Sequence, residues 1–264
     1  MLEERNIEEL ENKSIYIIRE AAAQFKNLGI LWSMGKDATV LLYLIRKAFL
    51  GKVPFTVVHI DTGHKFPEMY AMRDKYKEDW NLNLIVENAR YVKDPDLHRE
   101  QCGEIKAEAI RATIKKNSFD AIFVGIRKDE HVLRNKERIF SPRDIQFKWN
   151  YTSAPLEMWD TFNNALQPGE HMRIHPLLNW SEVDIWKYIE KENIPVNPLY
   201  FSKKGERFRS LGCIPCTKSF SSTASNIGEI IEELKVSQSS ERGGRLSSRE
   251  QLEVMQRLRA MGYF

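Results

Sequence analysis

The chain has 264 residues, enough for one large domain or for one domain with an extension. Its net charge is only +3, so bulk binding of nucleic acid is not expected. No apolar run approaches the length of a membrane span, and the first residues contain no apolar signal core. Three cysteines, an odd number, argue against a disulfide framework. Together these features predict a cytoplasmic protein that does not enter a membrane.

The first elements are a helix, a strand and a second helix. Apolar residues recur at helical spacing over 7–25, and a short apolar run over 29–32 predicts a buried strand. A loop centred on Gly35 follows, and a new helical pattern begins at Asp37. Such a junction presents free backbone N–H groups and the positive end of a helix dipole. It therefore predicts a pocket for the phosphates of a nucleotide.

The side chains of this loop suit that chemistry. Gly35 lets the backbone approach a phosphate, and Lys36 adds a cation. The residues expected to bind the nucleotide here are Ser33, Met34, Gly35, Lys36, Asp37, Ala38 and Thr39. Lys36 and Asp37 are also expected to be catalytic. The Walker pattern GxxxxGK(S/T) is absent, and the alternative is an ordinary surface turn with a capping Ser or Asp.

The next strand, 54–63, ends in polar residues. Strands that alternate with helices predict a parallel sheet, whose ligands lie at the carboxyl ends of the strands. His59 and Asp61 are therefore expected near the first loop and near a nucleotide. The carboxylate of Asp61 could orient a ribose or a Mg²⁺ ion. For His59 the alternative is a core histidine.

Cations are dense beyond the fourth predicted strand, 119–125, which ends at Gly125, another expected nucleotide-binding residue. The cations are Arg127, Lys128, Arg134, Lys136, Arg138 and Arg143. Arginine has forked donors that match sulfate or pyrophosphate, so these side chains could converge on such an anion. Those expected to be catalytic are Arg127, Lys128, Arg134 and Arg138. The alternative is a solvated helix face, because Glu130 and Arg134 form an ordinary surface pair.

The other elements complete an α/β fold. Helices are expected from Lys65 towards Asp79 and from Gln101, with a strand at 83–86 and a polar loop over 88–98 between them. Residues 150–170 look irregular, 172–177 extended and 179–189 helical. We predict a doubly wound, mostly parallel sheet with helices on both faces in a nucleotide-binding domain, 1–200. A C-terminal extension, 201–264, would hold a CxxC motif, a helix over 227–235, a mobile basic loop over 237–248 and a closing helix.

Several of these segments resemble one family. The loop resembles the SxGxDS pyrophosphate loop of the PP-loop ATP pyrophosphatases, which have the adenine nucleotide alpha hydrolase-like fold; Ala38 replaces the usual serine, and Thr39 beside it could compensate. Ser33–Asp37, His59–Gly63, Arg127–Glu130 and the tail 240–264 resemble the small, catalytic subunits of bacterial sulfate adenylyltransferases. The resemblance covers nearly the whole chain. It implies adenylyl transfer from ATP to sulfate, which yields adenosine 5′-phosphosulfate and pyrophosphate, with Mg²⁺ and a GTPase large subunit as partner.

The cysteines do not belong to that pattern. The surroundings of Cys102 resemble those in assimilatory adenylylsulfate reductases, where a Cys-Cys pair and a later CxxC hold a four-iron, four-sulfur (4Fe–4S) cluster. Gln101 stands where the first cysteine of the pair would be. Cys102, Cys213 and Cys216 would then hold a cluster with one open iron site. No cysteine lies beyond Cys216, which argues against a sulfonucleotide reductase.

The cysteines define a second hypothesis. Some PP-loop enzymes use an open-site Fe–S cluster to transfer sulfur, so this chain could be an ATP-dependent sulfurtransferase that thiolates an adenylated nucleotide or a tRNA base. Only under this hypothesis is nucleic acid a partner. The simpler alternative for the cysteines is a structural CxxC with Cys102 as a buried helix residue. A third hypothesis, supported only by Ala38, is a regulatory module that binds ATP without turnover.

Overall fold

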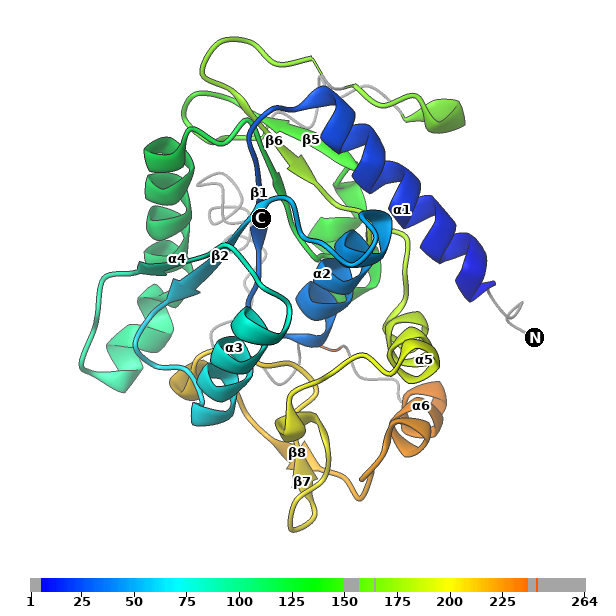
Figure 1. Cartoon of the computed structure of the whole chain (residues 1–264). Helices are drawn as coiled ribbons and strands as arrows, with labels where there is room; N and C mark the ends of the chain where they lie inside the picture. Colours follow the sequence, from blue (N-terminus) through cyan, green and yellow to red (C-terminus); the bar gives the residue numbers. More distant parts are fainter. Residues whose placement is uncertain (1–5, 150–156, 164, 237–240, 242–264) are drawn as a thin grey trace.

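The computed structural model describes residues 6–149, 157–163, 165–236 and 241 (Figure 1). Its main sheet has six strands in the order β3-β2-β1-β4-β6-β5. These strands are β1 (Leu28–Leu31), β2 (Thr56–Asp61), β3 (Leu84–Asn88), β4 (Ala121–Phe123), β5 (Phe140–Arg143) and β6 (His171–Ile174). All neighbouring pairs are parallel except β5 and β6, which are antiparallel. A separate hairpin joins β7 (Glu206–Arg207) to β8 (Phe220–Ser221).

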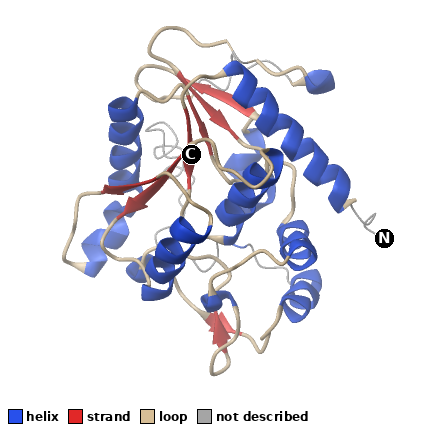
Figure 2. Ribbon diagram, in the orientation of Figure 1, coloured by secondary structure: helices blue, strands red, loops and turns tan. Residues whose placement is uncertain are grey.

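Helices cover both faces of this sheet (Figure 2). They are α1 (Ile7–Gln24), α2 (Lys36–Ala48), α3 (Pro67–Asp79), α4 (Pro95–Asn117), α5 (Glu182–Glu192) and α6 (Ile227–Val236). Successive residues of a strand face opposite layers, because the side-chain period of a strand is two. Val57 joins the large core cluster that includes residues of α1 and α2, whereas Val58 packs with Ile110 and Ile114 of α4. The predicted fold class, a doubly wound, mostly parallel α/β sheet, is confirmed.

The first turns of α4 were not predicted. The helix begins at Pro95, so the loop expected over 88–98 is wrong for its last four residues. Asp94 caps the helix by accepting the Leu97 N–H at 2.8 Å, and proline is favoured at the first helical position. Position 98 is therefore helical and lies one turn before Cys102.

The antiparallel edge strand β5 was not predicted either. It contains Pro142, which pairs in register with Met172, and Arg143, which pairs with His171. Proline is tolerated in a strand mainly at a sheet edge, where a missing N–H removes no ladder hydrogen bond. Arg143 is thus part of the sheet and does not belong to a cationic loop.

The segment after α5 crosses the carboxyl edge of the sheet. It runs through two short 3-10 turns and the hairpin strands before α6, and an isolated bridge pairs Cys213 with Lys65, which follows β2. The helix α6 then packs against α5. The expected basic loop lies outside the described residues except for Glu241, and the closing helix lies outside them entirely. Among the described helices, none has the length and apolar character needed to span a bilayer.

A candidate nucleotide site at the carboxyl edge of the sheet

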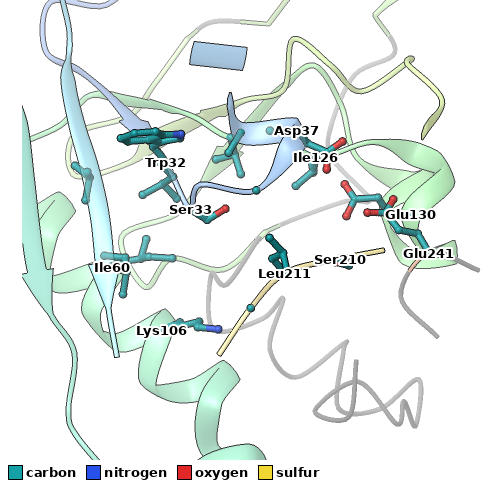
Figure 3. Close-up of a pocket in the computed structure, with 18 of the residues that line it drawn as sticks. Trp32, Ser33, Asp37, Ile60, Lys106, Ile126, Glu130, Ser210, Leu211 and Glu241 are labelled. Carbon is teal, nitrogen blue, oxygen red and sulfur yellow. The ribbon is translucent and has the colours of Figure 1, made fainter. Parts of the chain in front are cut away.

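A cavity of about 210 Å³ opens where the loops after β1, β2 and β4 meet (Figure 3). Ser33 and Asp37 border it from the first loop, and Lys106 of α4 and Leu211 of the crossing segment face them. The charged side chains that line it are Asp37, Lys65, Lys106, Glu130, Arg134 and Glu241. The carboxyl edge of a parallel sheet is the usual ligand position in open α/β folds. The cavity is therefore the candidate nucleotide site.

Two glycines shape the wall formed by α2. Gly35 is the N-cap of the helix and offers no side-chain cap, so the Lys36 N–H donates to the hydroxyl of Tyr200 at 2.9 Å. A Cβ on Gly125 would lie 3.1 Å from the backbone N and Cα of Ala38. Glycine there lets the loop after β4 pack directly on the first turn of α2. The helix N-terminus is thereby held at the cavity, where its dipole favours an anion.

A buried ionic cluster lies behind the loop. We define the ionic cluster as Lys36, Asp37, Arg127, Glu182 and Glu241. The guanidinium of Arg127, which is fully buried, contacts the carboxylates of Asp37 and Glu241. The ammonium of Lys36 also contacts Glu241, and it lies 3.7 Å from Glu182. Glu241 thus connects the loop cation to the arginine that follows β4.

Mutual attraction keeps this cluster charged. Burial by itself would lower the pKa of Lys36, but the carboxylates of Glu241 and Glu182 outweigh it and raise that pKa. Burial would likewise raise the pKa of Glu241, but Lys36 and Arg127 lower it well below its ordinary value. For Glu182, burial and repulsion from Glu241 prevail, and its pKa is raised. At neutral pH Lys36 therefore carries its proton and Glu241 is ionised.

Several predicted nucleotide-binding residues do not face the cavity. The hydroxyl of Thr39 accepts the Trp32 indole N–H at 3.1 Å, so it does not replace the hydroxyl that Ala38 lacks. Met34 is fully buried in the core, with a left-handed backbone (φ 57°). Asp61 accepts the Tyr70 hydroxyl at 2.8 Å and is absent from the cavity lining.

His59 is a core histidine. It is fully buried, and its Nδ1 donates to the backbone oxygen of Trp32 at 3.2 Å. Burial, and secondarily the nearby charge of Lys65, lowers its pKa to about 4. A neutral ring in this position ties β2 to the end of β1 and has no contact with the cavity. The structure thus places His59 in the core and outside the cavity lining, as the core alternative describes.

The cations after β4 separate and do not converge. Arg134 lines the cavity and contacts Glu130, and Arg127 belongs to the ionic cluster. Lys128 donates to the Asn179 side chain at 2.7 Å, outside the cavity lining. Arg143 is buried in β5, where Glu137 lies 3.3 Å away. Lys136, Arg138 and Arg127 are also absent from the lining, so Arg134 alone of the six cations lines the cavity.

Sequence patterns missed other lining residues. The residues come from four separate segments and are Lys65, Lys106, Tyr200, Leu211 and Glu241. Only Lys65 carried a signal, because it directly follows a strand whose carboxyl end was expected at this edge. The others reach the cavity through long-range packing.

A second cluster lies beside the cavity. The sulfurs of Cys102, Cys213 and Cys216 and a ring nitrogen of His98 all lie within 4.8 Å of one another. We call these four residues the thiol cluster. Sequence spacing left open whether the cysteines converge, and the structure brings them together. His98 was missed, although Asp94-Pro95 is a helix-start signal that places it one turn before Cys102.

Comparison with known proteins identifies the family. Residues 27–219 match the phosphoadenosine phosphosulfate reductase domain. The chain is 40% identical to sulfate adenylyltransferase subunit 2 of Zymomonas mobilis over all of both chains. The chain belongs to the sulfate adenylyltransferase subunit 2 family. The alignment with that relative spans 302 positions, more than the 264 residues of this chain, so it contains gaps in this chain. The family is one of nucleotidyltransferases, and its name indicates a partner subunit.

Solved structures agree with the fold of this family. FMN adenylyltransferase of Candida glabrata, solved with ATP, has a TM-score of 0.57 and 21% identity; the match covers 80% of this chain and 63% of that one. Phosphoadenylyl-sulfate reductase of Candida auris, solved with phosphate, has a TM-score of 0.51 and 19% identity; the match covers 81% and 97%. At these identities the likeness establishes the adenine nucleotide alpha hydrolase-like fold alone.

Proposed function

We propose that this chain is the catalytic subunit of a sulfate adenylyltransferase, which converts ATP and sulfate into adenosine 5′-phosphosulfate and pyrophosphate. The observation that carries the proposal is the full-length identity of 40% to a subunit of that name. In this chain the segment 33–38 at the junction of β1 and α2, which we call the phosphate loop, borders the cavity. In this reaction a sulfate oxygen attacks the α-phosphorus. The bond to the bridging oxygen of the β-phosphate breaks, and pyrophosphate leaves with both electrons of that bond.

The loop is suited to hold the leaving pyrophosphate. The N-terminal turn of α2 supplies its dipole, and the Ser33 hydroxyl lines the cavity beside it. Arg127 is held behind the loop by its contact with Asp37. Because the protein forms no covalent bond in this scheme, positioning and charge stabilisation carry the rate enhancement.

Cations across the cavity are suited to the sulfate. Arg134 approaches from the loop after β4, Lys106 from α4 and Lys65 from the loop after β2. Three carboxylates also line the cavity, those of Asp37, Glu130 and Glu241, so the lining is close to neutral. ATP is strongly anionic and needs further positive charge.

The carboxylates that line the cavity offer oxygen ligands of the kind that Mg²⁺ prefers. We infer that the ion enters the site bound to the substrate ATP. When bound, the ion neutralises phosphate charge. Asp37 belongs to the phosphate loop, and Glu130 lies among the cations after β4. We infer that these two lining carboxylates face the Mg²⁺ ion.

The partner and the compartment follow from the same proposal. Transfer of an adenylyl group to sulfate is unfavourable without coupling, which supports a GTPase as the partner subunit. The three cysteines are free thiols, which supports a reducing, cytoplasmic compartment. The sulfurtransferase alternative gains no support, because the Zymomonas mobilis relative carries the adenylyltransferase name over its full length.

The test is sulfate-dependent release of pyrophosphate by the chain assembled with its partner subunit and supplied with GTP. We expect release only when ATP and sulfate are both present. Ser33→Ala should reduce turnover by about tenfold or more, because it removes a donor to the leaving group. Ser219→Ala is the matched control, because Ser219 is half-buried outside the cavity lining and donates to Glu206 at 2.7 Å. Turnover that requires another acceptor in place of sulfate would refute the proposal.

A further inference from the structure

The thiol cluster has the composition and shape of a metal site. Three cysteine sulfurs and one imidazole nitrogen lie within 4.8 Å of one another, and all four residues are buried. Nothing in the proposed reaction uses them. We propose that His98, Cys102, Cys213 and Cys216 bind one Zn²⁺ ion in a closed, structural site. The inference goes beyond the adenylyl-transfer function and does not depend on it.

The distances fit a single ion. The sulfurs of Cys102 and Cys213 are 3.7 Å apart. A tetrahedral zinc ion with Zn–S bonds of about 2.3 Å holds its sulfurs about 3.8 Å apart. In a 4Fe–4S cluster each thiolate binds a different iron atom at a corner of the cube, so the sulfurs stand further apart. The spacing here therefore favours a mononuclear site over the cluster that the cysteines alone suggested.

His98 completes the coordination. It lies on α4 one turn before Cys102, so both side chains project from the same face of the helix. The ring is fully buried, and within the described part of the chain neither ring nitrogen makes a hydrogen bond of ordinary geometry. An unpartnered imidazole among three thiols is costly to bury unless it binds something. Three cysteines and one histidine form a common structural zinc set.

The CxxC motif forms a tight turn against α4. The Cys216 N–H donates to the backbone oxygen of Cys213 at 2.9 Å, and Arg99 of α4 donates to that of Pro215 at 2.9 Å. The Ile214 N–H donates to the backbone oxygen of His64 at 2.7 Å. These contacts orient both sulfurs of the motif toward the helix before any ion binds.

The surroundings supply outer contacts of the kind that metal ligands receive. The Thr62 hydroxyl lies 3.0 Å from the Cys213 sulfur, and it would donate to the thiolate of a metal-bound cysteine. The imidazole of His64 lies against that of His98, with ring centroids 4.2 Å apart. Thr62 and His64 both follow β2, so the site joins three segments: the loop after β2, α4 and the crossing segment.

The site would also fix two walls of the nucleotide cavity. Ser210, Leu211 and Gly212 line the cavity, and the next residue is the ligand Cys213. On the helix side, Lys106 lines the cavity one turn after Cys102. A zinc ion would therefore hold two walls of the cavity at a fixed separation without touching the substrates.

Metal analysis of the full-length chain tests the site. The protein is purified under reducing conditions without oxygen or chelator, and zinc, iron and acid-labile sulfide are measured. We expect about one zinc ion per chain that survives dialysis. Cobalt(II) introduced in its place should give the visible absorption of a tetrahedral thiolate complex. Stoichiometric iron with sulfide, or natively folded protein that takes up no zinc, would overturn the proposal.

Variants assign the ligands. Cys216→Ser and His98→Ala should each weaken zinc binding by at least about a hundredfold, since even outer contacts contribute ten- to a hundredfold. The matched control is His131→Ala, which removes a histidine outside the cluster and should leave zinc affinity unchanged. Unchanged affinity in His98→Ala would refute the role of the imidazole.

Two milder variants keep the proposal testable if ligand loss prevents folding. His98→Cys retains four ligands, so it should keep zinc and intensify the thiolate-to-cobalt charge-transfer band. Thr62→Val should weaken zinc binding by about tenfold while the chain remains folded. Loss of zinc from His98→Cys together with unchanged zinc affinity in Thr62→Val would contradict the assigned geometry. Because these experiments measure metal content, they can refute the zinc proposal whatever the adenylyltransferase assay shows.

Discussion

The phosphate loop, which lines the nucleotide cavity, and the thiol cluster, which lies beside that cavity, are built in different ways. The loop comes from one continuous stretch, 33–38, whose geometry follows from a strand, a glycine and a helix start. The thiol cluster joins residues of α4 to a turn that lies 111 residues further along the chain. A site formed by one contiguous segment can be predicted from the sequence. A site formed by segments that are distant in sequence can be recognised only when the three-dimensional structure is known.

The two regions also differ in how their polar groups are satisfied. The ionic cluster behind the loop carries its own counterions, so its charges remain stable without a ligand. The thiol cluster has an imidazole with no ordinary hydrogen bond among the described residues. The first region is therefore prepared for exchangeable anions, and the second for a permanent cation.

The largest expected effect is loss of Arg127. Arg127→Met would remove one of the two cations, Arg127 and Lys36, that contact the carboxylates of Asp37 and Glu241, at a cost of about 3–5 kcal/mol in unfolding free energy. We also expect pyrophosphate release to fall by about a hundredfold or more. Lys128→Met is the control, because Lys128 binds Asn179 outside the cavity lining. Urea unfolding and turnover of the assembled complex measure both effects, and equal losses in the two variants would contradict the assignment.

A smaller effect is expected from the glycine that packs on α2. Gly125→Val would drive side-chain atoms into the backbone of Ala38, 3.1 Å from the first added carbon. Such overpacking typically costs about 1–3 kcal/mol, and here the strain would displace the phosphate loop and raise the KM for ATP. Gly228→Ala, inside α6, has its nearest contact at 3.4 Å and should be neutral or slightly stabilising. An unchanged KM in Gly125→Val would show that the contact does not shape the site.

Acid should weaken the junction between β1 and β2 through His59. Its pKa is about 4 in the folded chain and 6.5 in its ordinary state, so folding favours the neutral ring. Stability is complete above about pH 6.5 and is lost as the pH falls towards 4, because the unfolded chain takes up the proton first. The loss at pH 5 should be about 2 kcal/mol.

The measurement is urea unfolding at pH 7.5 and pH 5 for the natural chain and for His59→Gln. The variant should lose less stability between the two values. Some dependence should remain, because burial also lowers the pKa of His175 to about 4. Identical pH dependence in both proteins would show that His59 is not the titrating group.

The smallest effect concerns the missing loop hydroxyl. Ala38→Ser would restore one donor at the cavity, and one hydrogen bond of about 0.5–1.5 kcal/mol should lower the KM for ATP by about two- to tenfold. Thr39→Val should leave that KM unchanged, because Thr39 faces Trp32. It should instead reduce stability by about 1–3 kcal/mol, since the buried indole N–H loses its acceptor. A raised KM in Thr39→Val would show that its hydroxyl does serve the nucleotide.

These regions also show what sequence patterns can predict. The alternation of strands and helices gave the sheet, and the loop motif placed Ser33 and Asp37 at the cavity. The start of α4 is predictable in principle, because Asp94-Pro95 is a helix-start signal. The positions of Tyr200 and Glu241 in the cavity lining could not be predicted, because no local sequence pattern shows that a distant segment packs on the carboxyl edge of the sheet. The arrangement of the cations after β4 could not be predicted, because the number of cationic residues in a segment does not show where each side chain points. The domain boundary at residue 200 stays a prediction.

The proline in β5 has a consequence for assembly. Among the described residues β5 is the last strand on its side of the sheet, and Pro142 removes one backbone donor from it. A protein that extended the sheet by adding its own strand there would find a gap in the hydrogen-bond ladder. A subunit that associates with this face would therefore recognise side chains, and this edge is protected against open-ended strand pairing between copies of the chain.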